Sequence, residues 1–445
     1  MKYKHFVSIL LVFVMLCACL TDVIADTAHK TFTSGDYEYT LLDDGTVKIT
    51  RYSGFAQELI IPDTLNDKKV TVIGDWAFVM NYFLTSVFIP NSVISIGSNA
   101  FASCDSLVSV SIPDSVTSIG SHAFSSCSSL TSVVIPNSVV LIGDSAFTCC
   151  FSLTSVSLPN FITSIGSSAF SHCFALTSVS ITPDDRTALN STDFTPETKA
   201  SIGDHAFASC SSLTSVSIPD SITSIGNSAF SDCTSLTSIF IPNHVVSIGD
   251  STFAYCHSLS SISLPDSIVS ISDSAFAYCT SLASISLPDS IVSIGDSAFT
   301  SCTSLASISL PDSIVSIGDS AFTSCTSLAS ISLPDSIVSI GDSAFAYCTS
   351  LASISLPDSI VSIGDYTFDS CHALTSFSIP SSVTKIGEGA FRFCLFLTSV
   401  SIPSSVTFIG KDAFKSYSNL TLSVLRNSYA ADYANANDIP YTYAD

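Results

Sequence analysis

Charge is scarce in this chain, and positive charge is the scarcer kind. Only 11% of its 445 residues are charged, and 14 Lys and Arg stand against 37 Asp and Glu, which gives a net charge of −23. An ordinary soluble domain carries about 25% charged residues. The shortage of cations excludes sequence-independent binding of nucleic acid, because that affinity comes from Lys and Arg that neutralise phosphates. Since 47% of the residues are hydrophobic, the composition also excludes a disordered chain.

Long apolar runs are missing beyond the N-terminus. The run nearest to spanning length covers residues 6–20, and a membrane-spanning helix needs roughly 20 residues. Two lysines precede this run, and small residues follow it up to Ala25. This arrangement predicts a secretory signal over residues 1–25, with a buried N-terminal helix as the plain alternative. A lipid anchor at Cys19 is a second interpretation of an exported leader. We therefore expect a secreted or cell-surface protein with no membrane span.

Prolines that follow an Ile or Leu recur every 23 residues, from Pro90 to Pro159 and again from Pro219 to Pro403. An insertion at 182–195 explains the one longer gap. The unit between prolines reads P-D-S-V/I-x-S-I-G-D-x-A-F-x-x-C-x-S-L-T/A-S-V/I-S-I/L. One such unit cannot bury its apolar residues alone, whereas stacked copies share a continuous core. The sequence therefore predicts a β-rich solenoid of about fifteen coils, with one short strand and one short helical turn in each.

Both ends of the array differ from the unit. Residues 36–41 and 46–50 alternate on either side of Gly45, which predicts a hairpin over the open edge of the first coil. We divide the chain into a signal at 1–25, an N-terminal hairpin cap at 26–61, the solenoid at 62–425 and a C-terminal cap at 426–445 with a short helix. The insertion offers Asp184, Asp185 and Arg186 as ligand contacts, and a tolerated surface loop is the plain alternative.

The unit resembles the leucine-rich repeats of the BspA-like, Treponema-type class over Pro62–Leu425. Phenylalanines stand at the family's position from Phe78 to Phe414, and the tail 428–445 also looks like the C-terminal ends of such proteins. The resemblance implies a leucine-rich-repeat solenoid and a bacterial surface or secreted protein, and some members are adhesins. The chain departs from the more familiar leucine-rich repeat because it has no asparagine ladder.

Thirteen of the sixteen cysteines recur at one position of the unit, from Cys104 to Cys394. Successive thiols then lie one coil apart with parallel side chains, whereas a disulfide needs Cβ vectors that converge. We expect a column of buried thiols that pack as small hydrophobic groups, in place of a disulfide framework. Cys149 is out of step and is expected to point outward. A zinc site is not expected, because no histidine column accompanies the thiols.

Residues 200–384 hold fifteen aspartates and no Lys or Arg. One column recurs in register, and two roles are open: each carboxylate caps the short turn of its own coil, or calcium bridges adjacent carboxylates. The calcium candidates are Asp250, Asp273, Asp296, Asp319, Asp342 and Asp365. A second column comprises Asp266, Asp289, Asp312, Asp335 and Asp358.

Some coils are near copies of each other. Residues 288–310 and 311–333 are identical, and 265–287 differs from 334–356 only in having Ser272 where the later coil has Gly341. Identical coils present identical surfaces, which favours a multivalent platform or a spacer over a unique pocket. Phe88, Val134 and Phe240 interrupt the outward serines of the predicted strands. They are either isolated exposed side chains or ligand contacts on the face that repeat proteins use for binding.

No catalytic motif stands apart from the repeat. The Gly-Asp-Ser tripeptide recurs as part of the unit, and an activated serine needs a base placed beside it. We expect a non-enzymatic binding or adhesion protein without a cofactor, whose acidic, Ser/Thr-rich surface binds an extracellular protein or glycan through many weak contacts. Host matrix proteins and mucins are the candidate partners, and nucleic acid is not. The alternatives are a structural surface spacer without a ligand and a hydrolase built on the insertion.

Overall fold

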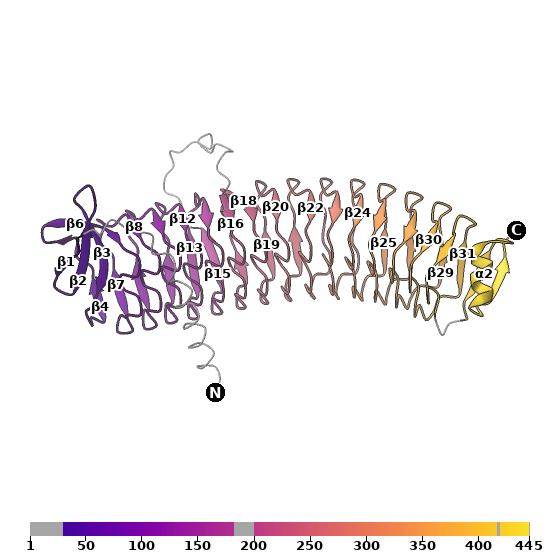
Figure 1. Cartoon of the computed structure of the whole chain (residues 1–445), viewed down its shortest axis with the longest axis horizontal. Coiled ribbons are helices and arrows are strands. Elements are labelled where there is room, and N and C mark those ends of the chain that lie inside the picture. Colours follow the sequence, from indigo (N-terminus) through magenta and orange to yellow (C-terminus); the bar gives the residue numbers. More distant parts are fainter. Residues whose placement is uncertain (1–29, 182–199, 416–418, 445) are drawn as a thin grey trace, which may run out of the picture.

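The computed structural model describes residues 30–181, 200–415 and 419–444. The chain winds into one elongated solenoid of about 16 turns of about 23 residues (Figure 1). One turn more than the expected fifteen forms because β3 (Val47–Tyr52) and β4 (Glu58–Ile60) make a coil before the first proline-led unit. The predicted signal at 1–25 and the predicted insertion at 182–195 lie outside the described residues.

Each coil places strands on two faces, where the sequence predicts only one strand. The unexpected strand is the Ser-Ile pair that precedes the glycine, and two residues are too few to show an alternating pattern. These strands pair in parallel from coil to coil and form what we call the Ser-Ile face. Its strands are β3, β6 (Lys68–Ile73), β8 (Ser95–Ile96), β10 (Ser118–Ile119), β12 (Leu141–Ile142), β14 (Ser164–Ile165), β16 (Ala200–Ile202), β18 (Ile222–Ile225), β20 (Ser247–Ile248), β22 (Ser270–Ile271), β23 (Ser293–Ile294), β24 (Ser316–Ile317), β26 (Ser339–Ile340), β28 (Ser362–Ile363), β30 (Lys385–Ile386) and β32 (Phe408–Ile409).

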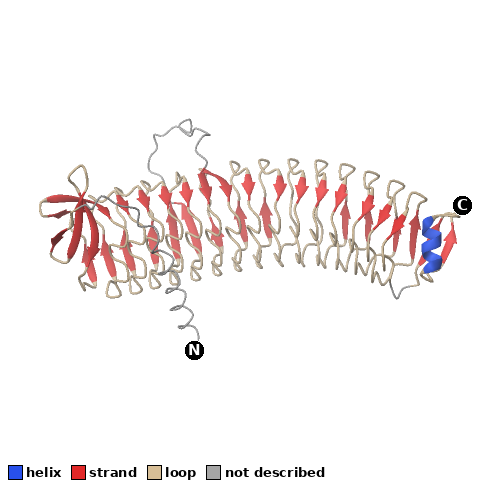
Figure 2. Ribbon diagram, in the orientation of Figure 1, coloured by secondary structure: helices blue, strands red, loops and turns tan. Residues whose placement is uncertain are grey.

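The predicted strand of each unit lies on the other side of the solenoid (Figure 2). Serines there flank one buried apolar residue. We call this side the Ser-x-Ser face. It narrows to isolated bridges between Ser263, Ser286, Ser309 and Ser332. Its strands are β4, β7 (Ser86–Phe88), β9 (Ser109–Ser111), β11 (Ser132–Val134), β13 (Ser155–Leu158), β15 (Ser178–Ile181), β17 (Ser215–Val216), β19 (Ser238–Phe240), β21 (Ser261–Ser263), β25 (Ser330–Ser332), β27 (Ser353–Ser355), β29 (Ser376–Ser378), β31 (Ser399–Ile402), β33 (Thr421–Val424) and β34 (Tyr441–Tyr443).

The segment that carries Ala and Phe is a series of tight turns, and the expected helical turn was wrong. Two residues of this segment adopt a left-handed backbone in each regular coil, as Ser297 (φ 56°) and Ser301 (φ 60°) do. Left-handed residues interrupt a right-handed helix. Their backbone N–H groups donate to the next coil instead, from Ser297 to the carbonyl of Asp319 at 2.7 Å and from Ser301 to that of Thr323 at 2.8 Å. The turn segment is thus a third ladder between coils.

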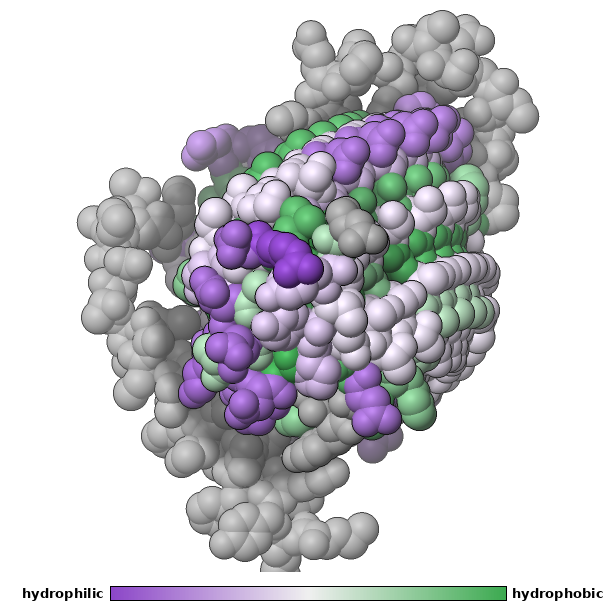
Figure 3. Space-filling model, turned by 90° about the vertical axis from the view of Figure 1, so that its right-hand side faces the viewer, coloured by the Kyte–Doolittle hydropathy of each residue, from purple (hydrophilic) through white to green (hydrophobic). Residues whose placement is uncertain are grey.

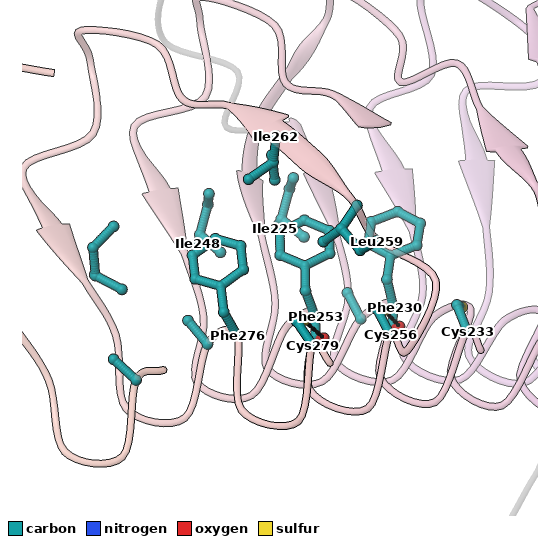
Figure 4. Close-up of a cluster of buried hydrophobic side chains, with 14 of the residues drawn as sticks. Ile225, Phe230, Cys233, Ile248, Phe253, Cys256, Leu259, Ile262, Phe276 and Cys279 are labelled. Atoms are coloured by element: carbon teal, nitrogen blue, oxygen red, sulfur yellow. Dashed lines mark hydrogen bonds between the residues drawn. The ribbon is translucent and has the colours of Figure 1, made fainter. Parts of the chain in front are cut away.

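The core is a column of phenylalanines surrounded by aliphatic side chains. Phe299 and Phe322 are fully buried, and their ring centroids lie 5.4 Å apart with nearly parallel planes. An offset stack of this kind is a favourable arrangement of aromatic rings. Figure 4 shows Phe230, Phe253 and Phe276 in such a row. Each coil therefore buries its apolar residues only against its two neighbours, as the repeat predicts.

Both ends of the solenoid carry non-repeat elements. At the N-terminal end, β1 (Phe32–Ser34), β2 (Tyr37–Leu41) and β3 form an antiparallel ribbon, and β3 pairs in parallel with β6. The short β5 (Thr64–Leu65) also pairs with β6. At the C-terminal end, the expected helix forms as α2 (Tyr429–Ala436), which begins where Ser428 accepts the Ala431 N–H, and it contacts β32 and β33. Within the described ranges, no helix is long and apolar enough to cross a membrane.

Candidate functional site

The cysteine column is structural. Every cysteine of the described chain is a free thiol, and the thirteen periodic ones are buried, which confirms the predicted column. Each of the thirteen periodic thiols donates a hydrogen bond to a phenylalanine carbonyl of the preceding coil, as Cys325 does to Phe299 at 3.2 Å. Burial raises the pKa of Cys302 and of Cys348 to about 12, so both stay protonated and unreactive. The out-of-step Cys149 is half-buried, and burial raises its pKa as well.

The aspartates of the calcium-candidate column join neighbouring coils. The backbone N–H of Asp319 donates to Oδ1 of Asp296 at 2.7 Å, and that of Asp342 donates to Oδ1 of Asp319 at 2.7 Å. The proposed cap of each coil's own turn is therefore wrong, because the carboxylate serves the coil that follows. This aspartate ladder is a hydrogen-bonded contact between successive coils. Calcium bridging stays a prediction, and no cluster of three or more His, Cys, Asp or Glu suited to a metal occurs among the described residues.

Steric hindrance explains why the residue beside the aspartate ladder is glycine. A Cβ on Gly318 would lie 2.4 Å from Oδ1 of Asp296 and 2.6 Å from the backbone nitrogen of the same residue. Real Cβ atoms do not approach other atoms this closely. The Gly-Asp pair of the unit is thus one device, since the small residue of each coil makes room for the carboxylate of the coil before it.

The Ser-x-Ser face places the three predicted contact residues in one exposed column. Phe88, Val134 and Phe240 are 50%, 63% and 66% exposed. Ser111 stands beside Phe88 in the ladder and precedes Val134 by one coil. Phe240 follows Val134 by four further coils. The structure therefore brings Phe88 and Val134 near each other and leaves Phe240 apart.

A shallow hollow lies at the N-terminal end of the Ser-x-Ser face, over β4, β7 and β9. Its volume is about 270 Å³. Ile60 lies beside Phe88 in register and is 76% exposed. Phe55 and Phe83 are also exposed and meet edge to face with their centroids 5.2 Å apart. The periodic pattern could not identify Ile60 or Phe55, because both precede its first regular unit.

A buried ion pair near the C-terminal end was also missed. Asp369 is 2% exposed and accepts two hydrogen bonds from Arg392 of the next coil, from Nε at 3.2 Å and from Nη2 at 2.8 Å. The Arg392 guanidinium also lies 4.8 Å from the ring centroid of Tyr366, and Tyr366 donates to Glu388 at 2.7 Å. The available signal was a pair of charges one coil apart, at a position that holds Ala, Ser or Thr in most other coils. The remaining contact candidates, Asp184, Asp185 and Arg186, lie outside the described residues, as does Cys19.

The periodic coils have counterparts in known proteins. The model of the BspA type leucine rich repeat region matches residues 71–195, 185–306 and 292–421. The chain belongs to the BspA-type leucine-rich repeat family. It is 31% identical to a leucine-rich cell surface protein of Faecalibacterium prausnitzii, with 94% of this chain and 99% of the other covered and a TM-score of 0.47. A leucine-rich repeat protein of Bacteroides ovatus is 28% identical, with 89% and 100% covered and a TM-score of 0.59. No curated protein matches the chain.

Membership confirms the resemblance and the fold class predicted from the unit. The BspA-type chain is a leucine-rich-repeat solenoid, and a structurally known protein similar to it comes from a bacterial cell surface.

Proposed function

We propose that this BspA-type chain is an exported, non-enzymatic binding or adhesion protein of the cell surface. The observation that carries the proposal is the Ser-x-Ser face, where exposed serines alternate with buried apolar residues along the solenoid and a few exposed apolar side chains interrupt them. Neighbouring strands of a sheet lie about 4.8 Å apart, so 16 turns extend over about 70 Å. Such a face suits an elongated extracellular protein or a glycan.

Many weak contacts in parallel would supply the affinity. Each coil contributes the same small set of hydroxyls, and every further contact after the first is intramolecular, which raises the effective concentration. Host matrix proteins and mucins are the partners we propose, because both present long repetitive surfaces. Phe88 and Val134 add exposed apolar contacts at one end of the face.

Deletion of whole coils tests this mechanism. Removing residues 265–356 takes out four complete units and joins Leu264 to Pro357 in the same phase of the repeat, so the remaining coils can stack. We expect the mature chain to bind immobilised mucin or matrix protein and the shortened chain to bind more weakly in proportion to the coils lost. Phe88→Ser with Val134→Ser is the matched variant that keeps the length and changes only the apolar contacts.

A structural spacer is the second candidate, and the identical coils 288–310 and 311–333 favour it. A spacer needs length and rigidity and makes no specific contact. It predicts no binding by either chain length to any of the partners tested. Binding that does not depend on coil number would contradict the multivalent mechanism and point to a single local site.

A further inference from the structure

An exposed stripe of valines runs along the solenoid next to the Ser-Ile face. Each valine immediately precedes the Ser-Ile strand of its coil and is 44–57% exposed. Their backbones are held from coil to coil, as the N–H of Val315 donates to the carbonyl of Val292 at 2.9 Å. We call these six residues the valine stripe. Its members are Val246, Val269, Val292, Val315, Val338 and Val361.

The coils directly before and after the valine stripe carry Thr223 and Thr384 at the same position, and earlier coils there alternate between threonine and the apolar Ile94 and Val140. The hydroxyl of Thr163 donates to the carbonyl of Val140 at 2.8 Å, and that of Thr384 donates to the carbonyl of Val361 at 3.3 Å. Threonine and valine have nearly the same shape, so each valine of the stripe gives up such a bond and exposes a methyl group instead. The position is solvated, so valine gains no core burial in return. Stability of the coil therefore does not account for the valines.

Negative charge borders the valine stripe on both sides. Asp289 stands three residues before Val292 and Asp296 four residues after it, and both are exposed. The same spacing recurs at the valines from Val269 to Val361, whereas Val246 has Asn243 at the first of the two positions, and no Lys or Arg occurs anywhere in residues 200–384. In the end-on view of Figure 3, residues of one kind form rows along the solenoid, with hydrophilic rows beside hydrophobic ones. The surface is thus an apolar line between two lines of uncompensated carboxylates.

We infer that the valine stripe binds a cationic, amphipathic polypeptide segment, in extended form, along the solenoid axis. This inference rests on the proposed binding function and names the class of partner. Apolar side chains on one face of the segment would contact the valines, while the long Lys or Arg side chains between them reach sideways to the flanking aspartates. Six coils extend over about 24 Å, which is the length of about seven extended residues.

Two other occupants fit this surface less well. A second copy of the chain would bring its own aspartate columns against these, and like charges repel. A neutral glycan would find neither an aromatic platform nor a hydrogen-bonding side chain on valine. The charge and the apolar character together select a polypeptide that carries both complementary features.

A labelled peptide that alternates Lys and Leu is the probe, and its binding to the mature chain is followed by fluorescence anisotropy. Peptides that alternate Glu with Leu and Lys with Ser are the controls for charge and for apolar contact. The decisive variant replaces all six residues of the valine stripe by threonine. It leaves every aspartate in place, and the same fold already holds threonine at this position in coils such as those of Thr117 and Thr163.

We expect the Lys-Leu peptide to bind the unmodified chain, and the threonine variant to bind it at least about tenfold more weakly. Equal binding by the threonine variant would overturn the inference, as would equal binding of the Lys-Ser peptide, which would show attraction by charge alone. Binding of the Glu-Leu peptide at equal strength would also overturn it. Mucin and matrix binding are measured on the same two chains. If these partners bind and the Lys-Leu peptide does not, the inference fails while the proposed function stands.

Discussion

Replacing Gly341 by alanine tests whether the aspartate ladder holds the coils together. A Cβ at this position would lie 2.3 Å from Oδ1 of Asp319 and 2.5 Å from its backbone nitrogen. The carboxylate must swing away to admit the methyl group. The backbone N–H of Asp342, which donates to that oxygen at 2.7 Å, then loses its acceptor. The perturbation is therefore one methyl group and one hydrogen bond between coils.

The size of the effect follows from three terms. A hydrogen bond to a charged group contributes about 1.5–3 kcal/mol, and the lower end applies because Asp319 is exposed. Alanine restricts the unfolded chain more than glycine does, which returns about 0.4–1 kcal/mol. The contact with the backbone nitrogen adds strain that no side-chain rotation relieves. We expect Gly341→Ala to lower the free energy of unfolding by about 1 kcal/mol or more.

The coil at 265–287 supplies the internal control, because Ser272 is its only difference from the coil that holds Gly341. The Ser272 hydroxyl donates to the carbonyl of Ile248 at 2.7 Å. Within the described chain, the N–H of Asp273 makes no ladder bond to Asp250, although the next five coils all have this bond. We therefore expect Gly341→Ser to destabilise the chain less than Gly341→Ala does, since its hydroxyl can replace the lost bond.

Chemical unfolding followed by circular dichroism measures these differences as shifts of the midpoint at constant slope. Ser355→Ala, on the exposed Ser-x-Ser face, is the control for an alanine that disturbs no ladder. Amide hydrogen exchange reports on the Asp342 N–H directly. If Gly341→Ala unfolds at the same midpoint as the unmodified chain and the Asp342 amide stays equally protected, the ladder does not stabilise the coils and the reasoning is refuted.

Three further predictions follow from the buried groups and the carboxylates. Burial raises the pKa of Cys302 and Cys348 to about 12, so the unfolded chain loses these thiol protons first. The stabilisation that comes from these protonated thiols should be fully present below about pH 8.5, and the free energy of unfolding should fall above it by about 1.4 kcal/mol per thiol and pH unit. An unfolding midpoint that does not change from about pH 7 to about pH 10 would contradict this. Arg392→Met leaves the buried Asp369 without its cation. It should lower the free energy of unfolding, measured in urea, by an amount near the lower end of about 3–5 kcal/mol. Threonine at both positions, as at Thr300, should restore most of that loss. Calcium bridging of the aspartate ladder requires a higher melting temperature in calcium than in chelator, and equal temperatures rule it out.

The period of the sequence was enough to predict the core. Phe299, Cys302 and their equivalents recur once per coil. The many copies identify each buried position even where a single coil departs from the pattern. The stacking of these residues follows because each coil buries its apolar side chains only against its neighbours. The Ser-Ile strand was not predicted, since a two-residue strand leaves no alternation. Ile60, in the hollow over β4, β7 and β9, was not predicted either, because it precedes the first regular unit.

Hydrogen bonds between coils could not be predicted from the period, and this changes where function is to be sought. A polar residue that recurs can either face a ligand or hold the next coil, and the sequence does not distinguish the two. Here the recurring Asp296 accepts the N–H of the next coil, and the recurring Ser290 donates to the carbonyl of Ile268 at 2.6 Å. Exposed apolar side chains have no such duty, as Phe240 on a serine column and Val292, at a position where other coils hold threonine, illustrate. These exposed apolar residues are therefore stronger binding candidates than the repeated polar residues, and variants at them separate binding from folding.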